Sequence, residues 1–84
     1  MATVEEFEAA AKKVNSLAQT PSNDVLLELY GLYKQATSGD VSGKRPGMLD
    51  MKGRAKFDAW TNRKGMSAEA ARTAYVALVA RIAR

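Results

Sequence analysis

The sequence predicts an all-α fold, a small four-helix bundle. Four segments repeat apolar residues with the period of an amphipathic helix, and helix-capping residues precede most of them. With 84 residues the chain has room for one domain, expected to span residues 1–84. A domain of this size buries only about 60–65% of the surface of its unfolded chain. A large ligand would therefore lie in a surface groove or between helices.

The first two helices are expected near the N-terminal half of the chain. The first runs from about Val4 to Leu17 and begins with a capping-box pattern at residues 3–6. The second follows residues 20–22, where either Thr20 or Ser22 could cap it, and ends near Thr37. The side chains expected to face the core are Val4, Phe7, Ala10, Ala11, Val14 and Leu17 in the first helix and Val25, Leu29, Leu32 and Ala36 in the second.

A long loop and two more helices complete the chain. Residues 38–49 hold three of the six glycines and one of the two prolines, and long ordered loops are often functional. The third helix is expected from near Asp50 to about Arg63, and the fourth from Ser67 to the end of the chain. The apolar positions expected to face inward are Gly53, Phe57 and Trp60, then Ala71, Ala74, Tyr75, Leu78 and Ile82, with Phe57 and Trp60 placed in the core.

Composition excludes several classes of function. The chain has no cysteine and no histidine, which removes disulfides, zinc sites and catalysis by Ser-His or Cys-His pairs, so no enzyme is expected. No apolar run is long enough to span a membrane, and no stable membrane insertion is expected. The acidic start of the chain lacks a secretory signal, which favours a cytoplasmic location.

The net charge of +4 is unevenly distributed. Residues 1–33 carry −3, residues 34–64 carry +5 and residues 65–84 carry +2. We therefore expect an anion to bind near the middle of the chain.

Two helix faces do not fit a purely structural bundle. In the second helix Leu27 falls nearly opposite the core, on the side where Tyr30 and Lys34 lie one turn apart. In the third, one flank holds three cations with a small residue among them, namely Lys52, Lys56, Ala59 and Arg63. Together they suggest a site for a phosphorylated, aromatic ligand with an apolar part. Solvated surfaces would produce much of the same pattern, so a basic helical module for another phosphorylated ligand or a protein partner stays open. Nucleic acid is not favoured, because no groove-reading motif is apparent.

Several motifs give the pattern a more specific meaning. Residues 30–40 read YGLYKQATSGD, residues 45–50 read RPGMLD, residues 52–60 read KGRAKFDAW, and Ala74-Tyr75 follows at a matching distance. From Phe7 to about Leu78 the chain resembles the acyl-CoA-binding protein family, whose signature is YxxYKQAxxGD. The resemblance implies an up-down-down-up bundle with a long connection between helices 2 and 3. It also implies binding of medium- and long-chain fatty acyl-CoA without catalysis or a cofactor, by a carrier expected to be monomeric with transient contacts to acyl-CoA-using enzymes.

The resemblance also implies roles for individual residues. Tyr30, Lys34 and Lys56 would hold the 3′-phosphate of CoA, Tyr33 would pack on the adenine, and Tyr75 would contact the nucleotide end. Leu27 and Met51 would border the ligand, and Lys52 belongs to the same expected site. Three positions depart from the family pattern: Asn15 stands where a lysine is common, Phe57 where tryptophan is common, and Met51 where phenylalanine is common.

Overall fold

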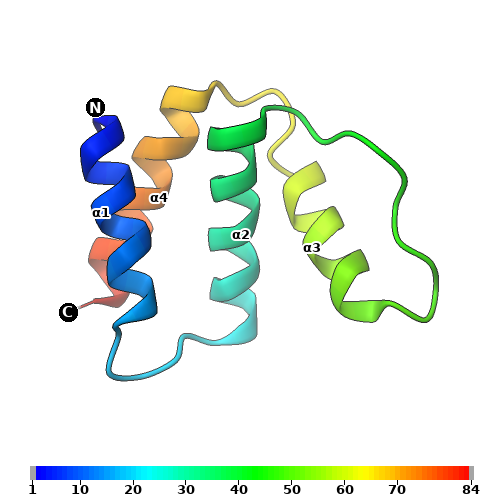
Figure 1. The fold of residues 1–84 in the computed structure, drawn as a ribbon, viewed down its shortest axis with the longest axis horizontal. Coiled ribbons are helices and arrows are strands. Elements are labelled where there is room, and N and C mark those ends of the chain that lie inside the picture. The colour runs from blue at the N-terminus through cyan, green and yellow to red at the C-terminus, as the bar shows by residue number, and fades with distance from the viewer. Residues whose placement is uncertain (1, 84) are drawn as a thin grey trace.

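Four helices build the molecule, in a computed structural model that describes residues 2–83 (Figure 1). They are α1 (Val4–Asn15), α2 (Asn23–Ser38), α3 (Met51–Thr61) and α4 (Ala68–Ile82). In Figure 1, α1 and α4 run in one direction while α2 and α3 run in the other, which confirms the up-down-down-up topology and the long connection before α3. The expected continuation of the fourth helix to Arg84 lies outside the described residues.

Local sequence explains where the helices begin. Thr3 accepts a hydrogen bond from the backbone N–H of Glu6, and the Glu6 carboxylate accepts one from the N–H of Thr3, which is the expected capping box. Ser22, and not Thr20, caps α2 by accepting from Val25, and Ser67 caps α4. The first helix ends two residues earlier than expected, because the hydroxyl of Ser16 donates to the carbonyl of Lys13 and tightens the turn.

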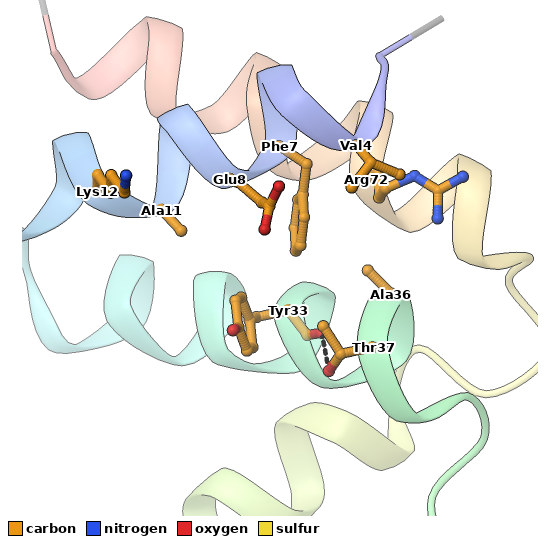
Figure 2. A pocket seen from close by; sticks show the side chains of 9 residues that line it. All are labelled: Val4, Phe7, Glu8, Ala11, Lys12, Tyr33, Ala36, Thr37 and Arg72. Atoms are coloured by element: carbon orange, nitrogen blue, oxygen red, sulfur yellow. Dashed lines mark hydrogen bonds between the residues drawn. The ribbon is translucent and has the colours of Figure 1, made fainter.

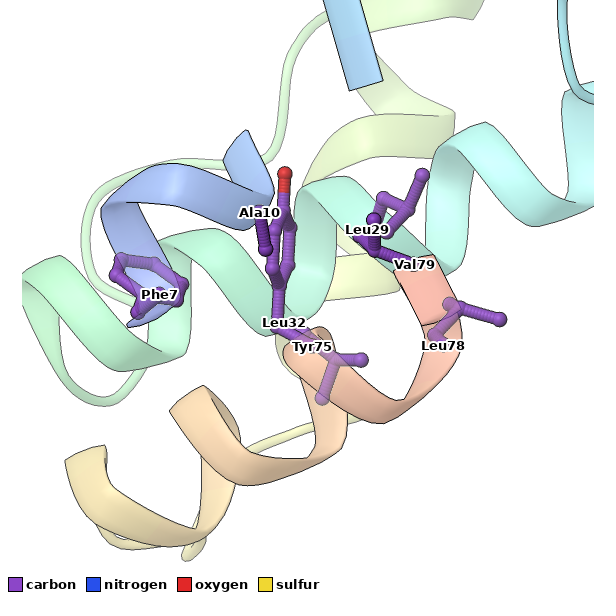
Figure 3. Close-up of a cluster of buried hydrophobic side chains, with 7 residues drawn as sticks. All are labelled: Phe7, Ala10, Leu29, Leu32, Tyr75, Leu78 and Val79. Atoms are coloured by element: carbon purple, nitrogen blue, oxygen red, sulfur yellow. The ribbon is translucent and has the colours of Figure 1, made fainter. Parts of the chain in front are cut away.

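The core lies between α1, α2 and α4 (Figure 3). Each large apolar side chain buried there stabilises the fold by roughly 1.5–3 kcal/mol relative to exposure. The expectation for Val4 was wrong, since its side chain is 51% exposed at the open end of α1. Val79 was not expected in the core yet is only 2% exposed, because α4 contacts both α1 and α2 and so buries a wider stripe. The buried apolar cluster comprises Phe7, Ala10, Leu29, Leu32, Tyr75, Leu78 and Val79.

The third helix stands apart from this core. It has no buried residue, so the placement of Phe57 and Trp60 in the core was wrong, and both are half-buried. The reason is that α3 contacts α2 alone and lies outside the cluster that side chains of α1, α2 and α4 form together. Backbone contact compensates in part, because Gly31 of α2 lies so close to the carbonyl of Ala59 that any Cβ would collide with it.

The buried side chain of Gln35 forms hydrogen bonds that connect the segment after α2 with the segment before α4. Gln35 is 1% exposed, and its amide donates to Asp40 at 2.8 Å and to the carbonyl of Met66 at 2.9 Å. The same oxygen of Asp40 accepts from the backbone N–H of Gly65, whose φ of 94° suits glycine. Within residues 2–83, no helix combines the length and apolar character needed to cross a membrane.

Candidate ligand-binding site

An open groove of about 380 Å³ runs between α2 and α3. Apolar side chains from the first turns of α2 line one side, and lysines of α3 stand on the other. Leu27, which the helical period placed away from the core, lines this groove, so its position is explained. Met51, Lys52 and Lys56 line the same groove. The lining residues are Asn23, Leu26, Leu27, Met51, Lys52, Ala55 and Lys56.

The close approach of the two helices shapes this groove. Because Gly31 has no side chain, α2 contacts the backbone of α3 near Ala59. Nearer the helix N-termini, the small side chain of Ala55 and the larger Leu26 and Leu27 line an open space instead. Neither Leu26 nor Ala55 was predicted as a site residue. The available signal for Ala55 was its position between Lys52 and Ala59 at helical spacing.

Tyr30 and Lys56 meet across the two helices. The Nζ atom of Lys56 lies 5.4 Å from the centroid of the Tyr30 ring, a cation–π distance. Since Lys56 also lines the groove, this pair lies beside it. An ammonium group and a phenol hydroxyl are therefore available together for an anionic group of a ligand.

Lys34 is held by a second contact of the same kind. Its Nζ atom lies 4.8 Å from the centroid of the Trp60 ring, and the side chain is half-buried. The indole N–H of Trp60 donates to the carbonyl of Gly39 at 2.8 Å, which fixes the ring against the start of the long loop. Lys34 and Tyr30 thus both reach toward α3, one helical turn apart.

Tyr33 faces a different hollow, between α1 and α2 (Figure 2). This space of about 360 Å³ also contains Phe7, whose ring stacks on that of Tyr33 with centroids 5.4 Å apart. Tyr33 remains 42% exposed, so one side of the aromatic pair is open to a planar group. Lys12 and Glu8 of α1 and Arg72 of α4 line the same hollow, and neither Glu8 nor Arg72 was predicted as a site residue.

Tyr75 lies behind these rings. It is 5% exposed and meets Phe7 edge-on at 5.1 Å. Burial raises the pKa of the Tyr75 hydroxyl, with a smaller contribution from Tyr33. Tyr75 therefore supports the other two rings from the core and has little contact with solvent.

The expected site residues thus form two groups on either side of α2. Tyr30, Leu27, Met51, Lys52 and Lys56 gather at the α2–α3 groove, with Lys34 one turn beyond. Tyr33 and Tyr75 belong to the α1–α2 side, and Asn15 is an exposed residue at the end of α1. No cluster of three or more His, Cys, Asp or Glu side chains suited to a metal ion occurs in the described part of the chain. An apolar groove with cations along its rim suits an amphiphilic anion.

These features define a small helical ligand-binding module, and comparison with known proteins makes the class specific. The family model described as "Acyl CoA binding protein" matches residues 4–79. The chain belongs to the acyl-CoA-binding protein family.

Individual relatives agree with this assignment. The acyl-CoA-binding protein of Saccharomyces cerevisiae is 56% identical over 73 residues, covering 87% of this chain and 84% of the relative. The acyl-CoA-binding protein homolog of Drosophila melanogaster is 52% identical over 75 residues, covering 89% and 87%. The crystal structure of Oryza sativa acyl-CoA-binding protein 2 superposes with a TM-score of 0.87 at 48% identity, covering 92% of this chain and 86% of that one.

Proposed function

We propose that this chain binds medium- and long-chain fatty acyl-CoA esters as a carrier, without catalysis. The observation that carries the proposal is the apolar groove between α2 and α3, bordered by Lys52 and Lys56 and joined to Tyr30. The acyl chain would occupy the groove against Leu27 and Met51. The charged head of CoA would lie across α2, where cations and tyrosines come from three helices.

Two parts of the CoA head, the 3′-phosphate and the adenine, would each have a matching group. Lys56, Tyr30 and Lys34 would hold the 3′-phosphate, because charge-assisted hydrogen bonds to phosphate are short and strong. The exposed face of Tyr33 would take the adenine ring. Tyr75, being nearly buried, would reach the nucleotide only with its rim and would otherwise support Phe7 and Tyr33 from behind.

The composition of the chain fits the absence of catalysis in this proposal. Carriage needs no nucleophile–base pair, in agreement with a chain that has neither cysteine nor histidine. We propose that residues 1–84 act as one acyl-CoA-binding domain, monomeric and cytoplasmic, with transient contacts to enzymes that use acyl-CoA and no affinity for specific nucleic acid sequences.

Calorimetric titration with free CoA, octanoyl-CoA and palmitoyl-CoA tests the proposal. Each methylene buried in the groove should add up to ~0.8 kcal/mol of binding free energy, so affinity should rise steeply along the series. A short DNA duplex serves as the control polyanion. Equal affinity for free CoA and palmitoyl-CoA would rule out an acyl groove. Preference for the duplex over every CoA ester would indicate a general basic module instead.

A further inference from the structure

The hollow between α1 and α2 brings an aromatic surface and two opposite charges together. Tyr33 is 42% exposed there, and its ring stacks on that of Phe7. Glu8 and Lys12 line the same hollow from α1, and in Figure 2 the carboxylate of Glu8 projects toward the helix that carries Tyr33. The hollow therefore offers one aromatic face, one hydrogen-bond acceptor and one hydrogen-bond donor.

Glu8 and Lys12 are not paired with each other. Their i, i+4 spacing, with the acid first, is the spacing that favours an ion pair along a helix. Nevertheless, no nitrogen–oxygen distance within 4.0 Å joins them to each other or to another charged side chain among residues 2–83. Ala11 lies on the same face of α1 and adds only a methyl group to the hollow. Both charged groups are therefore available to a ligand that lies on Tyr33.

Adenine carries a complementary pair of groups along one edge. Its 6-amino group donates hydrogen bonds, and the neighbouring ring nitrogen N1 accepts them. A carboxylate accepts hydrogen bonds and an ammonium group donates them. Proteins that hold a single base bind this edge with hydrogen bonds while an aromatic side chain stacks on the base. Glu8 and Lys12 beside Tyr33 provide the same combination.

We propose that Glu8 and Lys12 determine the specificity for the base of the CoA nucleotide, an inference that rests on the proposed function. The carboxylate of Glu8 accepts a hydrogen bond from the 6-amino group of adenine, and the ammonium group of Lys12 donates one to N1. Stacking on Tyr33 alone would accept any planar base. The two hydrogen bonds add a preference for the edge that adenine presents.

Analogues that change one group of the base at a time test the proposal. Calorimetric titrations use palmitoyl-CoA, its 6-deamino analogue, in which hydrogen replaces the amino group, and its 1-deaza analogue, in which C–H replaces N1. The wild-type chain should bind each analogue about three- to tenfold more weakly than palmitoyl-CoA, because one hydrogen bond is lost. Glu8→Ala should abolish the preference for palmitoyl-CoA over the 6-deamino analogue, and Lys12→Ala the preference over the 1-deaza analogue.

The readout is the ratio of two affinities within one variant. A general loss of attraction between the chain and the CoA phosphates lowers both affinities and leaves the ratio unchanged. Glu5→Ala and Lys13→Ala are matched controls, since they remove the same charges from exposed positions of α1 outside the hollow. Both controls should keep the wild-type ratios. Alanine favours a helix, and thermal melts check that every variant is folded.

Two results would overturn the proposal. One is a wild-type chain that binds either analogue as tightly as palmitoyl-CoA, and the other is a Glu8 or Lys12 variant that keeps the wild-type ratio. Comparison of free CoA with palmitoyl-CoA tests the proposed function separately, because both ligands carry the same base.

Discussion

The side-chain amide of Gln35 donates a hydrogen bond to the carboxylate of Asp40 across the end of α2, at 2.8 Å. Gln35 is the polar side chain buried in the described chain, and its second bond reaches the carbonyl of Met66 before α4. Asp40 in turn accepts from Gly65. Two residues of the sequence signature therefore join the end of α2 to the turn between α3 and α4, which makes their role structural.

Replacing Gln35 by leucine should destabilise the fold by roughly 1–3 kcal/mol, because Asp40 and the part-buried carbonyl of Met66 would each lose a hydrogen-bond donor. Chemical denaturation measures the change. Gln19→Leu is the matched control, since Gln19 is exposed, and it should change the unfolding free energy by about 0.5 kcal/mol or less. A cost no larger than that of the control would mean that the link does not stabilise the fold.

Acid should weaken the same link. The backbone N–H of Gly65, and then the amide of Gln35, hold the pKa of Asp40 below its ordinary value. A carboxylate with a depressed folded-state pKa contributes stability above its unfolded pKa, and this contribution is lost as pH falls through the folded pKa. The unfolding free energy should therefore decline below about pH 4. Asp40→Asn should be less stable at neutral pH and should decline less steeply in acid. If the unfolding free energy of this variant falls with pH as steeply as that of the wild type, another carboxylate causes the acid sensitivity. One such carboxylate is Asp58, whose pKa is lowered by its bond to Arg45.

Gly31→Ala should separate α2 from α3. Alanine normally favours a helix over glycine by about 1 kcal/mol, so propensity alone would stabilise the variant. Here the new Cβ would collide with the carbonyl oxygen of Ala59 and lie 2.9 Å from its carbon, both backbone atoms that move only with α3. We expect lower thermal stability and weaker binding of palmitoyl-CoA. A more stable variant with unchanged affinity would show that the helices can adjust without harm to the groove.

Lys56→Met should weaken binding of acyl-CoA by roughly tenfold to a hundredfold, through loss of a charge-assisted bond to phosphate. The unfolding free energy of the variant should change little, because Lys56 is exposed. The diagnostic ligand is the dephospho-CoA ester, which lacks the 3′-phosphate and should bind wild type and variant with similar affinity. Lys13→Met, on the exposed side of α1, is the charge-matched control. An equal loss for both ligands would place Lys56 at another part of the ligand.

Tyr30→Phe should reduce acyl-CoA affinity more than Tyr33→Phe. The hydroxyl of Tyr30 is proposed to donate a hydrogen bond to a phosphate beside Lys56. That bond would contribute about 0.5–3 kcal/mol to the binding free energy. Tyr33 is proposed to act through its ring instead. Tyr33→Ala should lower both affinity and thermal stability, since it also removes the stack on Phe7. Calorimetry with parallel melts compares the three variants, and a larger loss for Tyr33→Phe at equal stability would reverse the two roles.

Much of this organisation could be predicted from sequence, because its causes are local. The capping box at Thr3 depends on residues three positions apart. Leu27 was recognised because it is apolar although the helical period places it away from the core. The positions that failed depend on where helices meet. Phe57 and Trp60 look like core residues in isolation, but α3 lies outside the cluster formed by α1, α2 and α4, so both stay half-buried. The contact between Lys34 and Trp60 likewise joins residues brought together by the long loop.

The attachment of α3 by one side has a consequence for cooperativity. Contacts connect the helices in the order α1, α4, α2, α3, so α3 can detach without exposing the buried cluster of the other three. Opening of this helix should therefore cost less free energy than global unfolding, and its amides should exchange with solvent faster than those around the buried cluster. A ligand in the groove would supply the apolar neighbour that α3 otherwise lacks. Ligand binding in the groove and the folding of α3 are then thermodynamically coupled, so a bound ligand stabilises the folded helix.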